Sequence, residues 1–320
     1  MRAVGPARAV VLAAIALFAS FAARAADDPS PQELLAHMSA ALRTVDFQGS
    51  FIYQHEGRVD ALRIFHLGGE HERERLVSLT GPRGEVVRND GTITCVASGK
   101  VPTLFANRAD MRLLPLVPNV AAIGAQYSVA AGGEDRIAGF DARIVDIVPR
   151  DPYRYGYRLW LERDSHLLLR SAVVDAARRP LEQFMFVALD VGAKPRETDL
   201  LSSETGREAL SPADEVEIDA QSKWRVVPLP AGFRLVRAQR PFDTASQAEH
   251  LIYSDGLASV SVYVEPQPTA APARVESTLA RGVLSIHSLT DGALRVTAVG
   301  DVPAATVQAM ARNVQARSAH

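Results

Sequence analysis

The sequence of 320 residues predicts a two-part α+β fold, in which a large curled antiparallel sheet with a helix against it precedes a smaller second unit. Three observations lead to this prediction. One amphipathic helical segment near the N-terminus is followed by many short segments of alternating apolar and polar residues. A polar, acidic stretch over residues 193–222 interrupts this series, and a shorter series of the same kind follows. Many consecutive short strands after one helix are typical of an antiparallel sheet that curls around a core or a cavity.

The first 25 residues have the features of a secretory signal peptide. Two arginines precede an apolar run from Ala9 to Ala23, which is too short to span a bilayer comfortably, and Ala23-Arg24-Ala25 offers a small-residue cleavage site. We expect a mature chain that begins near Ala26. An uncleaved membrane anchor is the alternative.

Composition limits the partners and the chemistry. Cleavage removes three arginines and no acid, so the net charge falls from −2 to −5. An acidic, exported chain is not expected to bind nucleic acid. The single cysteine, Cys95, cannot form an intramolecular disulfide, and its place in an apolar strand predicts a buried, inert thiol. Stability must therefore come from packing, and the chain is long enough for two hydrophobic cores.

The first unit begins with the clearest local signal in the chain. Ser30-Pro31-Gln32-Glu33 is a capping box with proline in the first turn, and apolar residues follow at helical spacing, which predicts a helix over residues 31–44. The period then changes to two. Strands are predicted at residues 45–54, 62–67, 85–88, 92–97, 143–148, 153–162, 167–175 and 181–191, and turns at 68–69, 81–84, 89–91, 132–133 and 164–165.

Residues 100–128 do not follow this pattern. Pro115 and Pro118 lie among leucines and valines, so we expect a short helix or an apolar loop that acts as a lid or a plug beside the curved sheet.

The second unit is predicted to start at Trp224 and to end in a helix. Its strands are expected at residues 233–238, 250–253, 257–264, 283–288 and 294–299. Asp301 is expected to cap the final helix, with Pro303 in the first turn and apolar residues on one face: Val307, Met310 and Val314.

The best catalytic candidate is the segment FHLGGEHERER at residues 65–75. It gathers four metal-ligand types: His66, Glu70, His71 and Glu72. Zinc hydrolases place two histidines one helical turn apart, but Gly68-Gly69 breaks any helix here, so we interpret the segment as a solvated hairpin rim. The acidic pair Glu134-Asp135 is interpreted as turn charge. The sequence contains no nucleophile elbow, phosphate-binding loop or Cys/His grouping, and therefore predicts no enzyme, no metal and no cofactor.

The segment RYGYRLWLERDSHLLLR at residues 154–170 interleaves aromatic and basic residues. By strand period, one face carries Tyr153, Tyr155, Tyr157, Leu159 and Leu161, and the other carries Arg154, Gly156, Arg158, Trp160 and Glu162. A platform for single-stranded nucleic acid needs aromatics and cations on the same face. This separation favours a strand with one apolar side, and that side is either packed core or the wall of an apolar pocket.

Several separated segments resemble the periplasmic sigma-E regulators of the RseB/MucB family. They are, in chain order, GPRGEVVR (81–88), RIAGFDARIVDIVPRD (136–151), YGYRLWLERDSHLLLRS (155–171), LEQFMFVALDV (181–191), LPAGF (229–233) and YSDGLASVSVYVE (253–265). The resemblance covers nearly all of the mature chain. It implies an N-terminal half-open antiparallel β-barrel with helices, similar to the lipoprotein carriers LolA and LolB, and a smaller C-terminal α+β domain.

The resemblance also implies a division of labour along the chain. A signal peptide (1–25) precedes a LolA-like lipid-sensing domain (26–195), a linker (196–222) and a C-terminal domain (223–320) that binds the periplasmic segment of an RseA/MucA-type anti-sigma factor. Lipopolysaccharide or lipoprotein acyl chains are the implied releasing signals. We expect acyl chains near Phe47, Phe51, Leu113, Leu114, Leu116, Tyr155, Tyr157 and Phe184, and partner contacts at Trp224, Phe233, Tyr253 and Tyr263.

Two other functions compete with this prediction. A periplasmic lipoprotein or acyl-chain carrier would need only the first domain, so the second domain counts against it. A secreted hydrolase would need a nucleophile or an acid/base set that the sequence lacks. The lipid signal and the oligomeric state stay open, a homo-oligomer included.

Overall fold

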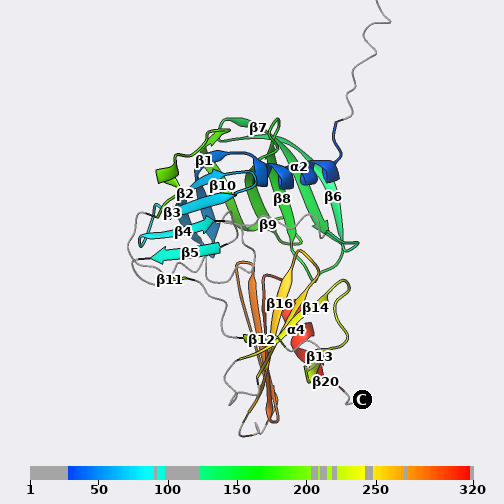
Figure 1. The fold of residues 1–320 in the computed structure, drawn as a ribbon. Helices are drawn as coiled ribbons and strands as arrows, with labels where there is room; N and C mark the ends of the chain where they lie inside the picture. The colour runs from blue at the N-terminus through cyan, green and yellow to red at the C-terminus, as the bar shows by residue number, and fades with distance from the viewer. Residues whose placement is uncertain are drawn as a thin grey trace, which may run out of the picture.

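The structure, a computed structural model, describes residues 28–89, 92–97, 123–202, 208–209, 215–217, 222–241, 248–267, 269 and 273–317. They form two large antiparallel sheets and one two-stranded sheet (Figure 1). The predicted signal peptide and residues 100–122 of the apolar loop, with Leu113, Leu114 and Leu116, lie outside these residues. Neither described α-helix has the length and apolar character needed to cross a membrane.

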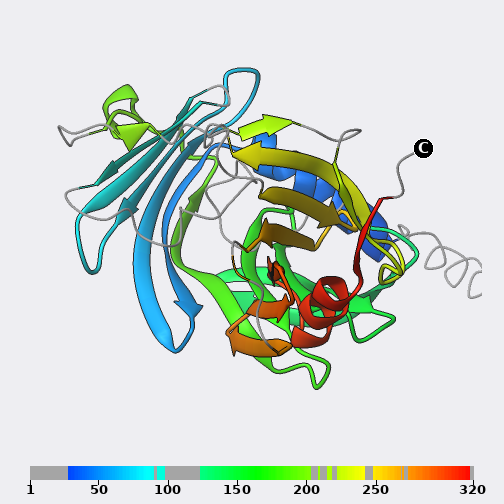
Figure 2. The same ribbon diagram turned by 90° about the horizontal axis from the view of Figure 1, so that it is seen from below.

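The larger sheet has eleven strands in the order β11-β5-β4-β3-β2-β1-β10-β9-β8-β7-β6. Its strands are β1 (Phe47–His55), β2 (Arg58–Leu67), β3 (Arg73–Ser78), β4 (Gly84–Asn89), β5 (Thr92–Ala97), β6 (Tyr127–Ile137), β7 (Phe140–Pro149), β8 (Gly156–Glu162), β9 (Leu168–Val174), β10 (Pro180–Val191) and β11 (Glu208–Ala209). The sheet curves strongly, as Figure 2 shows from below, yet β11 and β6 at its two ends do not pair. The predicted half-open antiparallel barrel is confirmed for the described residues.

The predicted N-terminal helix is α2 (Pro31–Thr44), and its capping box is present. The Glu33 amide donates to Ser30 Oγ at 3.3 Å, and the Ser30 amide donates to Glu33 Oε2 at 2.7 Å. These bonds satisfy two amides that the first turn of a helix leaves without partners. The apolar face of α2, including Met38 and Leu42, packs into the core beside β6 and β7 (Figure 1).

The turn predicted at Gly132-Gly133 is wrong. Both glycines lie inside β6, where the register against β7 shifts between Ala131 and Gly133. A β-carbon at Gly132 would lie 2.4 Å from Ile144 Cγ2, and Gly133 has φ +100, so the glycines permit a bulge instead of a turn. Glu134 and Asp135 consequently belong to a strand, and Asp135 accepts a hydrogen bond from Trp160 Nε1 at 2.9 Å.

The second sheet has seven strands in the order β12-β14-β15-β16-β19-β18-β17. They are β12 (Glu215–Glu217), β14 (Arg234–Pro241), β15 (Glu249–Ser254), β16 (Ser259–Pro266), β17 (Val275–Arg281), β18 (Leu284–Asp291) and β19 (Leu294–Gly300). Among the longer strands of the two sheets, β3, β6 and β17 were not predicted. The second sheet has its own hydrophobic core, separate from that of the larger sheet, which confirms the smaller α+β unit.

The C-terminal helix is α4 (Ala304–Arg312), packed against β18 and β19. Its N-cap is Pro303, which makes no side-chain cap bond, so the predicted cap at Asp301 is wrong. Val307 and Met310 are buried as expected, but Val314 already lies on β20 (Val314–Ala316), which pairs with β13 (Trp224–Val226). The segment between the two units contributes the short helix η3 (Glu197–Asp199), β11 to the larger sheet and β12 to the smaller one.

Candidate functional site

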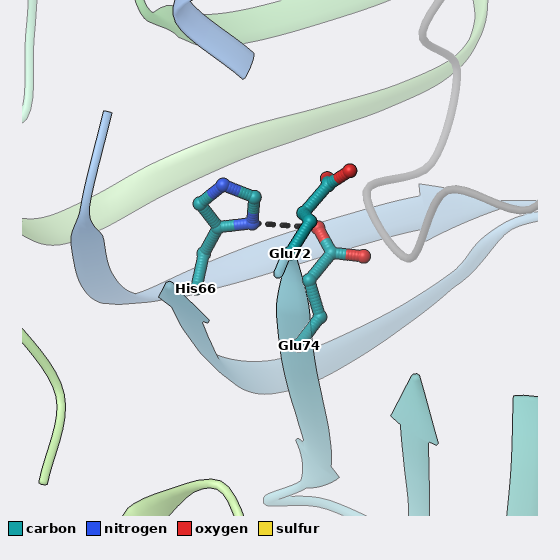
Figure 3. A group of neighbouring side chains, drawn as sticks. All are labelled: His66, Glu72 and Glu74. Atoms are coloured by element: carbon teal, nitrogen blue, oxygen red, sulfur yellow. Dashed lines mark hydrogen bonds and ion pairs between the residues drawn. The ribbon is translucent and has the colours of Figure 1, made fainter. Parts of the chain in front are cut away.

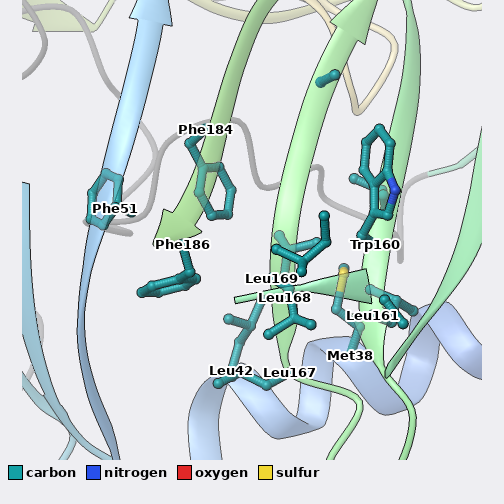
Figure 4. Packing of buried hydrophobic residues seen from close by; sticks show 14 of the residues in the cluster. Met38, Leu42, Phe51, Trp160, Leu161, Leu167, Leu168, Leu169, Phe184 and Phe186 are labelled. Atoms are coloured by element: carbon teal, nitrogen blue, oxygen red, sulfur yellow. The ribbon is translucent and has the colours of Figure 1, made fainter. Parts of the chain in front are cut away.

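All three phenylalanines expected in a lipid pocket lie in the packed core. Phe47, Phe51 and Phe184 are fully buried, and the Phe51 ring packs against both Phe184 and Phe186 with centroid distances of 5.7 Å (Figure 4). Edge-to-face packing of this kind stabilises the interior of a protein. These phenylalanines therefore belong to the same packed hydrophobic core as the apolar residues of α2.

The two tyrosines of the same prediction lie elsewhere. Tyr155 and Tyr157 line a cavity of about 480 Å³ at the ends of β7, β8 and β9, and Pro303 at the N-cap of α4 forms part of its wall. We call it the junction cavity because its walls come from both units. Its other lining residues include Asp146, Ile147, Asp151, Pro152, Arg154, Val174, Asp175, Ala176 and Arg178. Burial raises the pKa of the Tyr155 hydroxyl.

Arg154 connects the two units beside this cavity. It was predicted on the polar face of a strand, but β8 begins only at Gly156, and the Arg154 side chain is 0% exposed. Its Nε donates to Asp255 Oδ2 at 2.6 Å, and its guanidinium also reaches Asp151. We call this cluster the Arg154 hub. Its other members are Tyr127, the backbone carbonyl of Ala231 and the ring of Phe233.

The hub combines charge with aromatic contacts. The Arg154 guanidinium lies 4.9 Å from the centroid of the Phe233 ring and donates to the carbonyl of Ala231, both from the second unit. Tyr127 of β6 donates to Asp255 Oδ2 at 3.1 Å. Burial alone lowers the pKa of Arg154, but Asp255, with smaller contributions from Asp151 and Tyr127, raises it, so the pKa lies above its ordinary value. Burial and the same carboxylate raise the pKa of Tyr127.

A hairpin turn presents Asp255 to this hub. Asp255 Oδ1 accepts the amides of Leu257 and Ala258 at 2.9 and 2.7 Å, which fixes the turn between β15 and β16. Leu257 from this turn packs against the core of the larger sheet. Asp255 thus fixes its own turn through Oδ1 and binds Arg154 and Tyr127 of the first unit through Oδ2.

A second contact joins the units at the turn between β17 and β18. Glu182 of β10 is buried and accepts from the Tyr53 hydroxyl at 2.7 Å. Gly282 in this turn has φ +60, a conformation that favours glycine, and a β-carbon there would lie 2.9 Å from Oε1 at the end of the Glu182 side chain. Arg281 Nε adds an ion pair to Glu56 at 3.0 Å. Burial raises the pKa of Glu182.

The four residues expected to contact a partner have different environments. Tyr253 and Phe233 lie in the core of the second unit, where the Tyr253 hydroxyl accepts the Val226 amide at 3.0 Å. Trp224 on β13 is partly buried against that core. Tyr263 on β16 is 37% exposed and stacks on His250 with ring centroids 4.3 Å apart. Tyr263 is the most exposed of the four.

The segment at residues 65–75 contains a buried ionic network, while Glu70 and His71 in its turn are exposed, as predicted for a solvated rim. His66 is fully buried, contrary to the predicted solvated rim, and its Nδ1 lies 2.9 Å from Glu74 Oε1 (Figure 3). Arg88 from β4 donates to Glu74 Oε2 at 2.7 Å and also pairs with Glu72. Burial alone raises the pKa of Glu74, but His66 and Arg88 together hold it below its usual value.

This network could offer ligand atoms to a metal, since His66, Glu72 and Glu74 place them within 4.8 Å of one another. However, the Arg88 guanidinium already contacts both carboxylates and supplies the cationic charge. The donor set therefore fits a structural ion network better than a metal centre. Glu70 and His71 do not belong to the three-residue group.

Two family models match the chain. One is described as the MucB/RseB N-terminal domain and matches residues 30–208, and the other is described as the MucB/RseB C-terminal domain and matches residues 219–315. The chain belongs to the MucB/RseB family. The prediction made from the sequence segments is confirmed.

Named members of the MucB/RseB family match over most of their length. The chain is 34% identical to the sigma factor AlgU regulatory protein MucB of Pseudomonas aeruginosa, with 95% of each chain covered. It is 28% identical to the sigma-E factor regulatory protein RseB of Escherichia coli K12, covering 92% of this chain and 93% of RseB.

Solved structures of MucB extend the likeness to the fold. The crystal structure of MucB in complex with MucA(peri) has a TM-score of 0.73 at 32% identity, covering 90% of this chain and 100% of that one. The crystal structure of MucB has a TM-score of 0.60 at 29% identity, covering 90% and 98%.

Proposed function

We propose that the protein is a periplasmic negative regulator of the sigma-E envelope stress response. It binds the periplasmic segment of an RseA/MucA-type anti-sigma factor and shields this segment from site-1 proteolysis. Lipidic signals, such as lipopolysaccharide or lipoprotein acyl chains, release it. It acts by occupancy and carries out no chemical reaction.

The observation that carries this proposal is the likeness to MucB in complex with MucA(peri), at a TM-score of 0.73 over 90% of the chain. Both units of this chain are matched by models of the same family, which supports a regulator over a carrier that needs only the first unit. A catalyst needs reactive groups held at an accessible site. The strongest candidate group, at His66, is buried and paired with Glu74.

We assign the roles along the chain as follows. Residues 1–25 direct export, residues 26–195 sense lipid, residues 196–222 link the units, and residues 223–320 bind the anti-sigma segment. Tyr263 provides an exposed aromatic surface on the second unit, and aromatic side chains are frequent anchors in protein interfaces.

Binding of the mature chain to the periplasmic segment of its anti-sigma factor tests the proposal. Isothermal titration should show a saturable one-to-one complex, and lipopolysaccharide should weaken it. Site-1 protease should cleave the free segment faster than the bound segment. Equal cleavage rates with and without a saturating amount of the protein would reject the shielding role.

A further inference from the structure

A buried carboxylate lies where the turn between β17 and β18 meets the first unit. Glu182 on β10 is 7% exposed, and Val283 in the turn is buried. A β-carbon at Gly282 would lie 2.9 Å from Glu182 Oε1, so the backbone of the turn lies directly against the carboxylate. The backbone amide of Val283 faces the same carboxylate as a hydrogen-bond donor. We call this contact the Glu182 joint.

The first unit supplies a neutral donor to the joint. The Tyr53 hydroxyl on β1 donates to Glu182 Oε2 at 2.7 Å. The Tyr53 ring stacks on His55 with ring centroids 4.7 Å apart, and His55 Nε2 lies 2.8 Å from Asp60 Oδ2. The imidazole therefore has another carboxylate as its partner.

The second unit brings further charges to the joint. Arg281 Nε pairs with Glu56 at 3.0 Å, so these two charges offset each other. Asp301, in the exposed loop between β19 and α4, adds a negative charge that repels an ionised Glu182. Tyr155 in the junction cavity lies within electrostatic range of both carboxylates, but burial raises the pKa of its hydroxyl, which stays neutral below pH 10.

These surroundings make a proton on Glu182 more favourable when the joint is closed. Burial raises the pKa of Glu182, the Tyr53 hydroxyl opposes this rise, and Asp301 adds to it. The turn against the carboxylate and Asp301 both belong to the second unit, so their effects weaken when the joint opens. Closure of the joint and binding of a proton by Glu182 are therefore linked, and each favours the other.

The raised pKa fixes the direction of this linkage. Closure is most favourable below the ordinary pKa of a glutamate, about 4.3. It weakens as pH rises toward the raised value and changes no further above that value. The Arg154 hub does not respond in this way, because the pKa of Arg154 lies above its ordinary value and the guanidinium stays charged. The two contacts between the units thus differ in their response to pH.

We propose that the Glu182 joint is a proton-sensitive contact between the two units: protonation of Glu182 closes it against the β17–β18 turn, and loss of the proton loosens it, while the Arg154 hub keeps the units attached. This regulation by pH goes beyond the proposed function and does not depend on it, because neither the anti-sigma segment nor a lipid takes part.

Hydrogen exchange of the Val283 amide in the mature full-length chain tests the proposal. Val283 lies in the turn, outside the ladder between β17 and β18, and its amide faces Glu182. Exchange is followed by NMR from about pH 4.3, the ordinary pKa of a glutamate, to about pH 8, and each rate is divided by the intrinsic rate at that pH. Protection should fall by up to about tenfold per pH unit, the slope for one linked proton, and then level off. Protection that stays constant or rises with pH would overturn the proposal.

Asp301→Asn changes the joint from an exposed position of the second unit. Loss of the like charge lowers the pKa of Glu182 in the closed joint, so the fall in protection should end at a lower pH than in the wild type. The matched control is Asp291→Asn, an exposed position at the far end of β18, which should leave the wild-type curve unchanged. Identical curves for Asp301→Asn and the wild type would contradict the assigned electrostatics.

Glu182→Gln removes the titrating group and mimics the protonated carboxyl. Protection of the Val283 amide should then stay at the high, acid level across the whole pH range. Glu162→Gln replaces another buried glutamate, which binds the amides of its own turn at Asp164 and Ser165, and should keep the wild-type slope. A slope that persists in Glu182→Gln would overturn the assignment to Glu182. Asp301→Asn carries the test if Glu182→Gln folds poorly, since its site is exposed.

Discussion

Replacing Asp255 by asparagine should destabilise the protein more than any exposed charge substitution. The asparagine side chain keeps an oxygen for the turn amides of Leu257 and Ala258, which donate to Oδ1 of the aspartate at 2.9 and 2.7 Å. It loses the negative charge that faces Arg154 Nε at 2.6 Å, and it places its amide nitrogen, a donor, against that donor. The Arg154 and Asp255 side chains are 0% and 2% exposed, so the guanidinium would stay buried with Asp151 as its remaining charged partner among the described residues.

The magnitude follows from this burial. Removing one partner of a buried ion pair costs about 3–5 kcal/mol, and the asparagine amide nitrogen cannot accept the Arg154 Nε hydrogen, so no hydrogen bond replaces the lost one. We therefore expect Asp255→Asn to lower the free energy of unfolding by about 3–5 kcal/mol, measured by urea denaturation followed by circular dichroism. The control is Glu134→Gln, which breaks the exposed ion pair with Arg163 and should barely move the midpoint. A similar, small shift in both variants would refute the view that the hub is a buried ion pair.

Four further predictions concern other parts of the molecule. Burial raises the pKa of Glu182, so the ionised carboxylate destabilises the folded state at neutral pH. Glu182→Gln should therefore raise the urea midpoint at pH 7. The wild type should become more stable as pH falls through the raised pKa, and the variant should not show this gain. The pKa of Glu74 is lowered, so its ionised form stabilises the folded state, and this stability is lost as pH falls below about 4.5. Glu74→Gln should lower the free energy of unfolding by about 3 kcal/mol at pH 7. The variant should also lose less stability than the wild type when the solution is acidified. Phe184→Ala removes a fully buried ring and should lower the free energy of unfolding by about 3–5 kcal/mol in calorimetry or denaturation. Tyr263→Ala should weaken the anti-sigma complex by at least about 2 kcal/mol in titration while leaving the unfolding midpoint nearly unchanged; an unaltered affinity removes Tyr263 from the interface.

The local signals of the sequence predicted most of the elements. The capping box at Ser30 and the alternation of apolar residues act over a few neighbours, so they identify a helix and strands without tertiary information. The same local reasoning failed at Gly132-Gly133, because glycine pairs permit both turns and bulges, and only pairing with β7 selects the bulge.

The candidate site was harder to predict because its contacts join residues far apart in the chain. Alternation placed Arg154 on the polar face of a strand, but the strand begins two residues later and the Arg154 side chain contacts Asp255 of the second unit. Nothing near Arg154 in the sequence indicates this partner. Similarly, the alternation of aromatic and aliphatic residues along the strands does not tell whether their apolar face is packed core or the wall of a pocket. In the structure Phe184 is completely buried, whereas Tyr155 lines a cavity.

The central claim is that this protein binds an anti-sigma segment and gives it up to a lipidic signal. The most direct measurement is a pull-down of the anti-sigma periplasmic segment by the mature chain, with and without lipopolysaccharide. We expect capture of the segment in buffer and its loss as lipopolysaccharide is added. Failure to capture the segment in buffer, or capture that lipopolysaccharide leaves unchanged, would contradict the claim.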